Sequence, residues 1–89
     1  MKVKVFFDPI FGRLTGTEAT DLVLEAPDLA GLVAALTDRY GQSFKEALID
    51  PRGVMVPGVV VLADGVSLNP DSPIPEGVEI AFLTAIAGG

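Results

Sequence analysis

The candidate reactive group of this sequence is its own α-carboxylate, which ends the doublet Gly88-Gly89. Glycine lacks a Cβ, so two in succession make a narrow segment that can lie extended in a channel, close to the backbone of another protein. The doublet directly follows the mainly apolar run 83–87, without an intervening polar segment. This pattern predicts a chain end whose carboxylate is offered to a partner enzyme, with a frayed end of no function as the alternative.

Two residue types that often perform catalysis do not occur in this chain. The sequence contains no cysteine and no histidine, which excludes a thiolate nucleophile, a disulfide, a Cys-based zinc site and the usual general base. We therefore expect a protein that is not an enzyme, that binds no cofactor or metal itself, and whose chemistry resides in partner enzymes. Four acidic residues have no spacing typical of a metal-binding loop and are interpreted as solvated turn residues: Asp64, Asp71, Glu76 and Glu79.

Charge and hydropathy limit the partners and the location. Twelve acidic against six basic residues give a net charge of −6, so we expect neither nucleic acid nor a membrane as a partner. Residues 1–5 lack the apolar run of a signal peptide, and no run approaches the roughly eighteen apolar residues of a membrane span. With 49% hydrophobic residues, the chain is predicted to be a cytoplasmic protein with one domain over 1–89 and a flexible tail over about 84–89.

The order of the expected elements follows from hydrophobic periodicity and turn residues. Asp28 is the expected N-cap of the longest helix, and Gly41 is placed to end it. Asp64-Gly65 is a dipeptide typical of a two-residue hairpin turn. In chain order the expected elements are a strand over 2–7, a loop or loose hairpin over 8–17, a strand over 20–25, a helix over 29–40, a short helical turn over 43–49, and strands over 59–63, 66–68 and 78–83.

This order predicts an α+β fold of the ubiquitin-like β-grasp type, a mixed four- to five-stranded sheet packed on one main helix. The first and last strands are expected side by side and parallel at the centre, because the helix supplies the long crossover that parallel neighbours need. A ferredoxin-like fold would need a second full-length helix near residues 66–77, where three prolines prevent one.

Strand alternation predicts an apolar patch on the face of the sheet that the helix leaves open. In the first strand Phe6 points away from the helix, and in the last strand Ala81 and Leu83 do. If the two strands are neighbours, these side chains lie together, and half of the run 59–63 extends them. Such a patch is typical of a partner-binding surface, whereas a covering loop or a register shifted by one residue would remove it. Weaker candidates for the same surface are the loop residues Phe11 and Leu14.

Three segments carry a resemblance to a known family: 57–65 as its third strand and hairpin turn, 75–82 as its acidic turn and final strand, and 87–89 as its ending. The whole chain resembles the small sulfur-carrier proteins. The small subunit of molybdopterin synthase (MoaD type) is the closest pattern, and the thiamine-pathway carrier (ThiS type) is a more distant relative. Two positions depart from the family: Asp64 stands where asparagine is usual, and Leu83-Thr84 stands where the molybdopterin subunit often has two prolines.

The resemblance implies a role for the C-terminal tail. In this family an E1-like adenylyltransferase uses ATP and magnesium to form an acyl-adenylate on the last glycine, and a sulfur donor then displaces AMP to leave a thiocarboxylate. The tail is inserted into the large subunit of molybdopterin synthase or meets another sulfur acceptor. Carried over to this sequence, the reacting residue is Gly89, the residue that keeps the tail narrow is Gly88, and the partner-binding residues are Phe6, Ala81, Leu83, Ile86 and Ala87.

Several functions remain open within and beyond this family. Molybdopterin (molybdenum or tungsten cofactor) biosynthesis is the leading interpretation, because the thiamine carrier usually has less chain where this sequence has residues 44–55. Thiamine biosynthesis, tRNA thiolation and amino-acid biosynthesis are alternatives. A ubiquitin-like covalent protein modifier would share the activation step and end in an isopeptide bond from Gly89 to a lysine. A non-covalent β-grasp interaction module would not need Gly88-Gly89.

Overall fold

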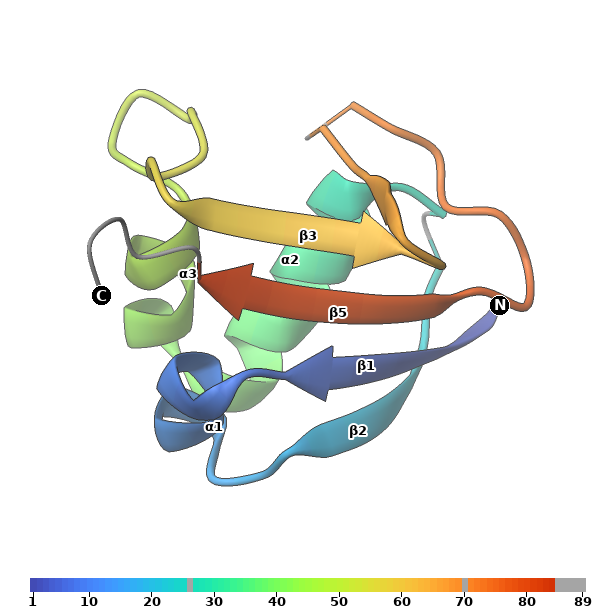
Figure 1. The fold of residues 1–89 in the computed structure, drawn as a ribbon, viewed down its shortest axis with the longest axis horizontal. Coiled ribbons are helices and arrows are strands. Elements are labelled where there is room, and N and C mark those ends of the chain that lie inside the picture. The colour runs from blue at the N-terminus through green and yellow to red at the C-terminus, as the bar shows by residue number, and fades with distance from the viewer. Residues whose placement is uncertain (26, 70, 85–89) are drawn as a thin grey trace.

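The computed structural model describes residues 1–25, 27–69 and 71–84. The strands form a mixed five-stranded sheet in the order β2-β1-β5-β3-β4 (Figure 1). The elements in chain order are β1 (Lys2–Phe7), α1 (Pro9–Thr15), β2 (Ala19–Val23), α2 (Leu29–Tyr40), α3 (Gln42–Leu48), β3 (Val59–Ala63), β4 (Val66–Ser67) and β5 (Glu79–Thr84).

Strands β1 and β5 lie side by side and parallel in the middle of the sheet, with Phe6 opposite Ala81 and Phe7 opposite Phe82. Strand β2 pairs antiparallel with β1, and β3 pairs antiparallel with β5. Helix α2 crosses behind the sheet in Figure 1, so one face of the sheet is covered and the other is open. This arrangement confirms the expected β-grasp, with α2 as its main helix.

The core lies between the sheet and the helices. Alternate residues of β1 are buried, as the sequence predicts, and Ile80 and Phe82 of β5 are fully buried beside them. Val78, just before β5, is half-buried. The neighbouring aromatic rings in the core are 5.6–6.0 Å apart between centroids, and the cluster they form consists of Phe7, Phe11, Phe44 and Phe82.

Helix α2 begins and ends at the residues that its sequence signals predict. The Oδ1 atom of Asp28 accepts a hydrogen bond from the backbone N–H of Gly31 at 2.7 Å, which satisfies one of the free donors of the first turn. Gly41 ends the helix with a φ of 98°, and its N–H donates to the carbonyl of Thr37. The buried stripe that faces the sheet consists of Leu29, Leu32, Val33 and Leu36.

The expected loop over residues 8–17 is wrong, because most of it forms helix α1. Asp8 caps the helix through a bond from the N–H of Phe11 to its Oδ1 at 2.9 Å, and Pro9 occupies the first helical position, where a missing N–H costs nothing. Gly16 ends the helix with a φ of 77°. Asp8, Pro9 and Gly16 are therefore helix boundaries. Phe11 is fully buried, so its assignment to a surface is wrong, and Leu14 is partly buried.

The bounds of β1, α2 and β3 are the expected ones, and those of β2, α3, β4 and β5 differ from the expected ones by one or two residues. The dipeptide Asp64-Gly65 makes the expected tight turn, with positive φ values of 46° and 84°. Strand β5 ends at Thr84, which is expected to start the flexible tail and is instead part of the sheet.

In the part of the chain that the structure describes, no helix is long and apolar enough to cross a membrane.

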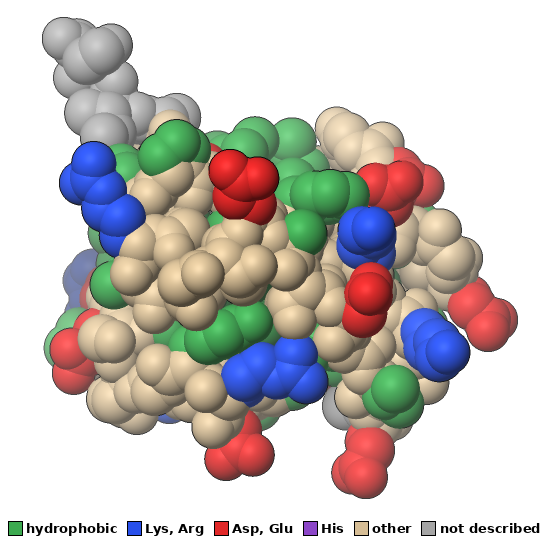
Figure 2. Space-filling view, turned by 90° about the horizontal axis from the view of Figure 1, so that it is seen from below, with side chains coloured by type: hydrophobic (Ala, Val, Ile, Leu, Met, Phe, Trp, Pro, Cys, Tyr) green, Lys and Arg blue, Asp and Glu red, His purple; other side chains and the backbone are tan. Residues whose placement is uncertain are grey.

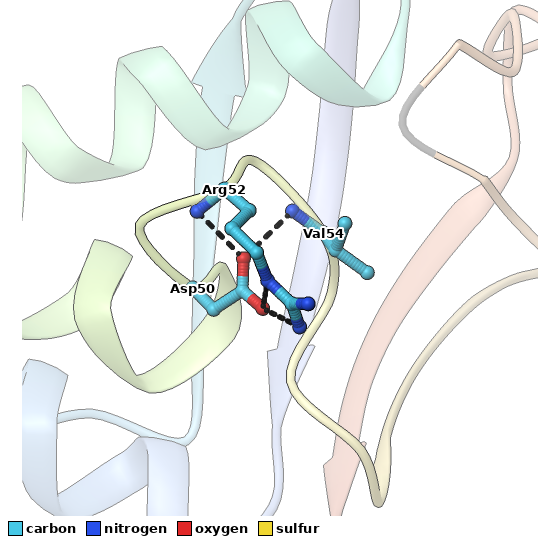
Figure 3. Close-up of polar contacts among 3 residues, drawn as sticks. All are labelled: Asp50, Arg52 and Val54. Atoms are coloured by element: carbon cyan, nitrogen blue, oxygen red, sulfur yellow. Dashed lines mark hydrogen bonds and ion pairs between the residues drawn. The ribbon is translucent and has the colours of Figure 1, made fainter.

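The connection between α3 and β3 is ordered by one carboxylate (Figure 3). Oδ1 of Asp50 accepts hydrogen bonds from the N–H groups of Arg52 and Val54, at 2.9 and 3.0 Å, while Oδ2 lies 2.9 Å from Nη2 of Arg52. The bonds from Val54 and Arg52 hold the pKa of Asp50 below its usual value of 3.8. This loop is the part of the segment 44–55 that follows α3.

Candidate functional site

The candidate site begins where strand β5 ends. Because β1 and β5 are parallel neighbours, their C-terminal ends lie side by side at the same end of the sheet, near helix α1 (Figure 1). Thr84 is the last residue of β5 and the last that the structure describes. The predicted site residues Ile86, Ala87, Gly88 and Gly89 lie outside the described residues.

The structure brings the other three predicted residues together on the open face of the sheet. Phe6 pairs with Ala81, and Leu83 follows on the same face. The side chains of Phe6 and Leu83 are 36% and 38% exposed, so neither a covering loop nor a shifted register has removed them from the surface. In the neighbouring strand β3, Val60 lies opposite Leu83 and Leu62 lies opposite Ala81, so both extend this apolar surface. We call the resulting surface the open-face patch, and it consists of Phe6, Val60, Leu62, Ala81 and Leu83.

Charge on the open face lies at the end away from the tail. Lys4 stands opposite Asp21 on one side and Glu79 on the other. The Nζ atom of Lys4 also lies 5.6 Å from the ring centroid of Phe6, within reach of a cation–π attraction. The open face of the sheet is therefore apolar toward the end of β5, where the open-face patch lies, and charged at the opposite end. On the side of the molecule shown in Figure 2, Lys and Arg side chains are scattered among Asp and Glu without forming a continuous basic surface.

Asp8 lies beside the end of β5 and is not among the site residues predicted from the sequence. Its Oδ2 accepts hydrogen bonds from the N–H of Thr84 at 2.6 Å and from Oγ1 of Thr84 at 2.5 Å. Burial raises the pKa of Asp8, but the bonds from Thr84, Phe11 and Ile10 outweigh this effect and hold the pKa below 3.8. The Asp-Pro dipeptide after a strand signals a helix cap, whereas nothing local signals a partner 76 positions away.

The four acids interpreted as solvated turn residues do not come together as a metal site. Oδ1 of Asp64 accepts a hydrogen bond from the N–H of Glu79 at 2.9 Å, so this carboxylate stabilises the turn between β3 and β4 against β5. Within residues 1–25, 27–69 and 71–84, no three acidic, histidine or cysteine side chains are grouped to hold a metal ion.

Comparison with known proteins gives a family match and several similar structures. The sequence matches the ThiS family over residues 10–89. No curated protein matches the sequence. The structure is similar to that of SAMP1 from Haloferax volcanii, with a TM-score of 0.84 at 13% identity over 100% of both chains.

Two further similar structures carry molybdopterin names. One is molybdopterin converting factor subunit 1 from Pyrococcus furiosus, with a TM-score of 0.76 at 21% identity over 97% of this chain and 99% of the other. The other is a complex of subunits 1 and 2 of the molybdopterin-converting factor from Helicobacter pylori, with a TM-score of 0.61 at 26% identity over 100% of both chains. The family match and these structures agree on the fold.

Proposed function

We propose, because this chain belongs to the ThiS family of ubiquitin-like sulfur carriers, that Gly89 carries sulfur as a thiocarboxylate for molybdopterin biosynthesis. The observation that supports this most is the family match, which runs through Gly88 and Gly89 in a chain without cysteine or histidine. The chain itself supplies neither a sulfur nucleophile nor a histidine base. Its carboxylate is therefore the substrate on which partner enzymes act.

The chemistry needs activation because a carboxylate is a poor electrophile. In the proposed sequence, a carboxylate oxygen of Gly89 attacks the α-phosphorus of ATP on an E1-like enzyme that holds magnesium, and pyrophosphate leaves. Sulfide then attacks the carbonyl carbon of the acyl-adenylate, AMP leaves, and the thiocarboxylate remains. The sulfur next passes to the acceptor, for which we propose the large subunit of molybdopterin synthase.

The open-face patch is the proposed docking surface for these partners. The patch lies toward the end of β5, so a protein seated on Phe6 and Leu83 meets the first residues of the tail. Two large side chains that are each more than a third exposed on one sheet face fit a surface that is buried on association. We propose that Ile86 and Ala87 continue this contact into the partner.

The carrier function is tested by the intact mass of the chain after incubation with the E1-like enzyme of the same organism, ATP, magnesium and sulfide. We expect the mass to rise by the difference between a sulfur and an oxygen atom. Deletion of Gly88-Gly89 should abolish the change, and Gly88→Ala should slow it, because a Cβ enters a narrow channel. Gly12→Ala is the matched control, since its new Cβ meets the carbonyl oxygen of Thr17 at an ordinary 3.5 Å. An unchanged wild-type mass contradicts the proposal.

Docking through the open-face patch is tested by placing a charge on it. Phe6→Asp should raise the KM of the carrier for the E1-like enzyme at least about tenfold and change kcat little. The reason is that it removes an apolar contact that is equally strong in the bound ground state and in the transition state. Val66→Asp is the control, because Val66 is 67% exposed and lies outside the patch. Equal effects of the two substitutions would contradict the assignment of this surface.

A second candidate function is covalent protein modification. It is favoured by the similarity to SAMP1, because a related structure is named a small archaeal modifier protein. The acyl-adenylate is shared by both functions, and the difference is whether a lysine amine or a sulfur nucleophile attacks it. Conjugates of higher mass on a denaturing gel that depend on Gly89 would favour the modifier, and their absence together with a thiocarboxylate would favour the carrier.

A further inference from the structure

Strand β1 ends at Phe7, opposite Phe82, whereas its neighbour β5 continues to Thr84. The N–H of Asp8 donates to the carbonyl of Phe82 at 3.0 Å, which continues the pairing of β1 with β5 just past Phe7. Pro9 then starts helix α1, and its fixed φ turns the chain away from the sheet. The next donor that β5 turns toward β1 is the N–H of Thr84. It does not bond to the carbonyl of Asp8, because that carbonyl accepts from the N–H of Gly12 in α1 at 2.7 Å.

The carboxylate of Asp8 takes the place of that missing backbone acceptor. Its two oxygens serve different elements: Oδ1 caps α1 through Phe11, and Oδ2 accepts both the N–H and the Oγ1–H of Thr84. Hydrogen bonds to a charged acceptor are shorter and stronger than neutral ones, in agreement with the 2.6 and 2.5 Å distances. On its other side Thr84 pairs with Val59 of β3. Thr84 is thus flanked by Asp8 on the β1 side and by Val59 on the β3 side.

The position of Thr84 matters because the chain beyond it is short. Five residues lie after Thr84, and Gly89 is the last of them. An extended chain spans at most about 3.5 Å per residue, so the reactive carboxylate can reach no further than roughly 17 Å from its starting point. A displacement of Thr84 therefore moves the point from which the proposed reacting residue starts its reach.

We propose that Asp8 is a positioning residue that fixes the place and direction in which the tail leaves the sheet, with the hydroxyl of Thr84 as its partner. The inference rests on the proposed function, because it concerns the presentation of Gly89 to the adenylating enzyme. Docking through the open-face patch brings the two proteins together, and the bonds between Asp8 and Thr84 then align the tail with the channel. Asp8 touches neither ATP nor the reacting carboxylate.

The experiment separates the two roles of Asp8 with conservative variants. Asp8→Asn keeps the helix cap, because asparagine caps as well as aspartate, but loses the charged acceptor shared by both donors of Thr84. Thr84→Val removes the hydroxyl donor, and Thr84→Ser retains it. Asp28→Asn is the matched control, since Asp28 caps α2 through Gly31 in the same way as Asp8 caps α1. Thermal unfolding establishes that each variant is folded at the assay temperature.

The measured quantities are kcat and KM of the wild-type and variant chains for adenylation by the E1-like enzyme of the same organism. We expect Asp8→Asn and Thr84→Val to lower kcat by about tenfold, because misplacing a reacting group by about 1 Å can cost up to a hundredfold. Their KM should stay within about twofold, because the open-face patch is unchanged. Thr84→Ser should restore kcat, and Asp28→Asn should leave both constants unchanged.

The outcomes distinguish this inference from the proposed function. If the wild-type chain is not adenylated, the proposed function is wrong and the inference falls with it. If the wild-type chain is adenylated and the folded Asp8→Asn and Thr84→Val variants react equally fast, the inference alone is overturned. A rise in KM without a fall in kcat, or an equal fall in Asp28→Asn, also overturns it, because either result indicates a general structural effect.

Discussion

Asp8 and Asp28 are the N-cap residues of two different helices, but only the carboxylate of Asp8 also binds a residue far away in the sequence. Each precedes its helix and accepts a hydrogen bond from the N–H three residues on, Phe11 at 2.9 Å for Asp8 and Gly31 at 2.7 Å for Asp28. The second oxygen of Asp8 also binds Thr84, 76 positions away. The same residue type with the same local role thus stabilises a helix in one case and, in the other, also joins that helix to the end of the central strand.

Alanine substitutions test this difference most strongly. Asp8→Ala removes a cap worth about 1 kcal/mol and two bonds to a charged acceptor worth about 1.5 kcal/mol each at the low end. We expect the free energy of unfolding, measured in urea, to fall by roughly 4 kcal/mol for Asp8→Ala and by about 1 kcal/mol for Asp28→Ala. Equal losses in the two variants would show that the bonds to Thr84 contribute nothing to stability.

The pH dependence of stability isolates the charge of Asp8. Its pKa in the folded state lies below 3.8, because hydrogen bonds from Thr84, Phe11 and Ile10 outweigh burial, which raises it. A carboxylate with a lowered folded pKa stabilises the fold above its unfolded pKa, and this contribution is lost as the pH falls through the folded pKa.

The free energy of unfolding should therefore differ between wild type and Asp8→Asn by about 2 kcal/mol at neutral pH, and the two should converge in acid. Urea unfolding at a series of pH values measures the difference, in which the contribution of Asp50 cancels because both chains contain it. A difference that stays constant down to the acid end of the series would contradict the assigned role of the Asp8 charge.

The hydroxyl of Thr84 gives the smallest of these effects. Thr84→Val keeps the shape and the backbone N–H but loses one hydrogen bond to a charged acceptor, so we expect about 1.5 kcal/mol less stability. Thr84→Ser should keep the bond and lose only a methyl group. Hydrogen exchange of the amide at position 84 gives a second measurement. Exchange should be faster in Asp8→Asn than in Thr84→Val, because only the former removes the charged acceptor. The reverse order would contradict the bond from this amide to Asp8.

Much of the fold follows from local signals in the sequence. The alternation of Lys2–Phe7 identifies the buried face of β1, and Asp64-Gly65 identifies the turn between β3 and β4. Asp28 and Gly41 identify the limits of α2. These predictions succeed because each depends on a single residue type or a short period that the tertiary structure does not override.

The failure at α1 has a physical reason. Asp8, Pro9 and Gly16 occur both in turns and at helix ends, and the seven-residue helix between its caps is too short for a clear period. Its one fully buried side chain, Phe11, decides the matter only when the core is known. Of the candidate site, alternation predicts the open-face patch, since it is a property of two strands. The bond from Thr84 to Asp8 depends on the parallel pairing of the two ends of the chain and has no local signal.

The central position of β5 has a consequence for how the protein is made. Strand β5 lies between β1 and β3, yet it is the last strand in the order of synthesis. A chain that ends before Glu79 leaves one edge of β1 and one edge of β3 unpaired, with no strand between them. The five-stranded sheet therefore cannot form until β5 has been synthesised, and its halves expose strand edges until then.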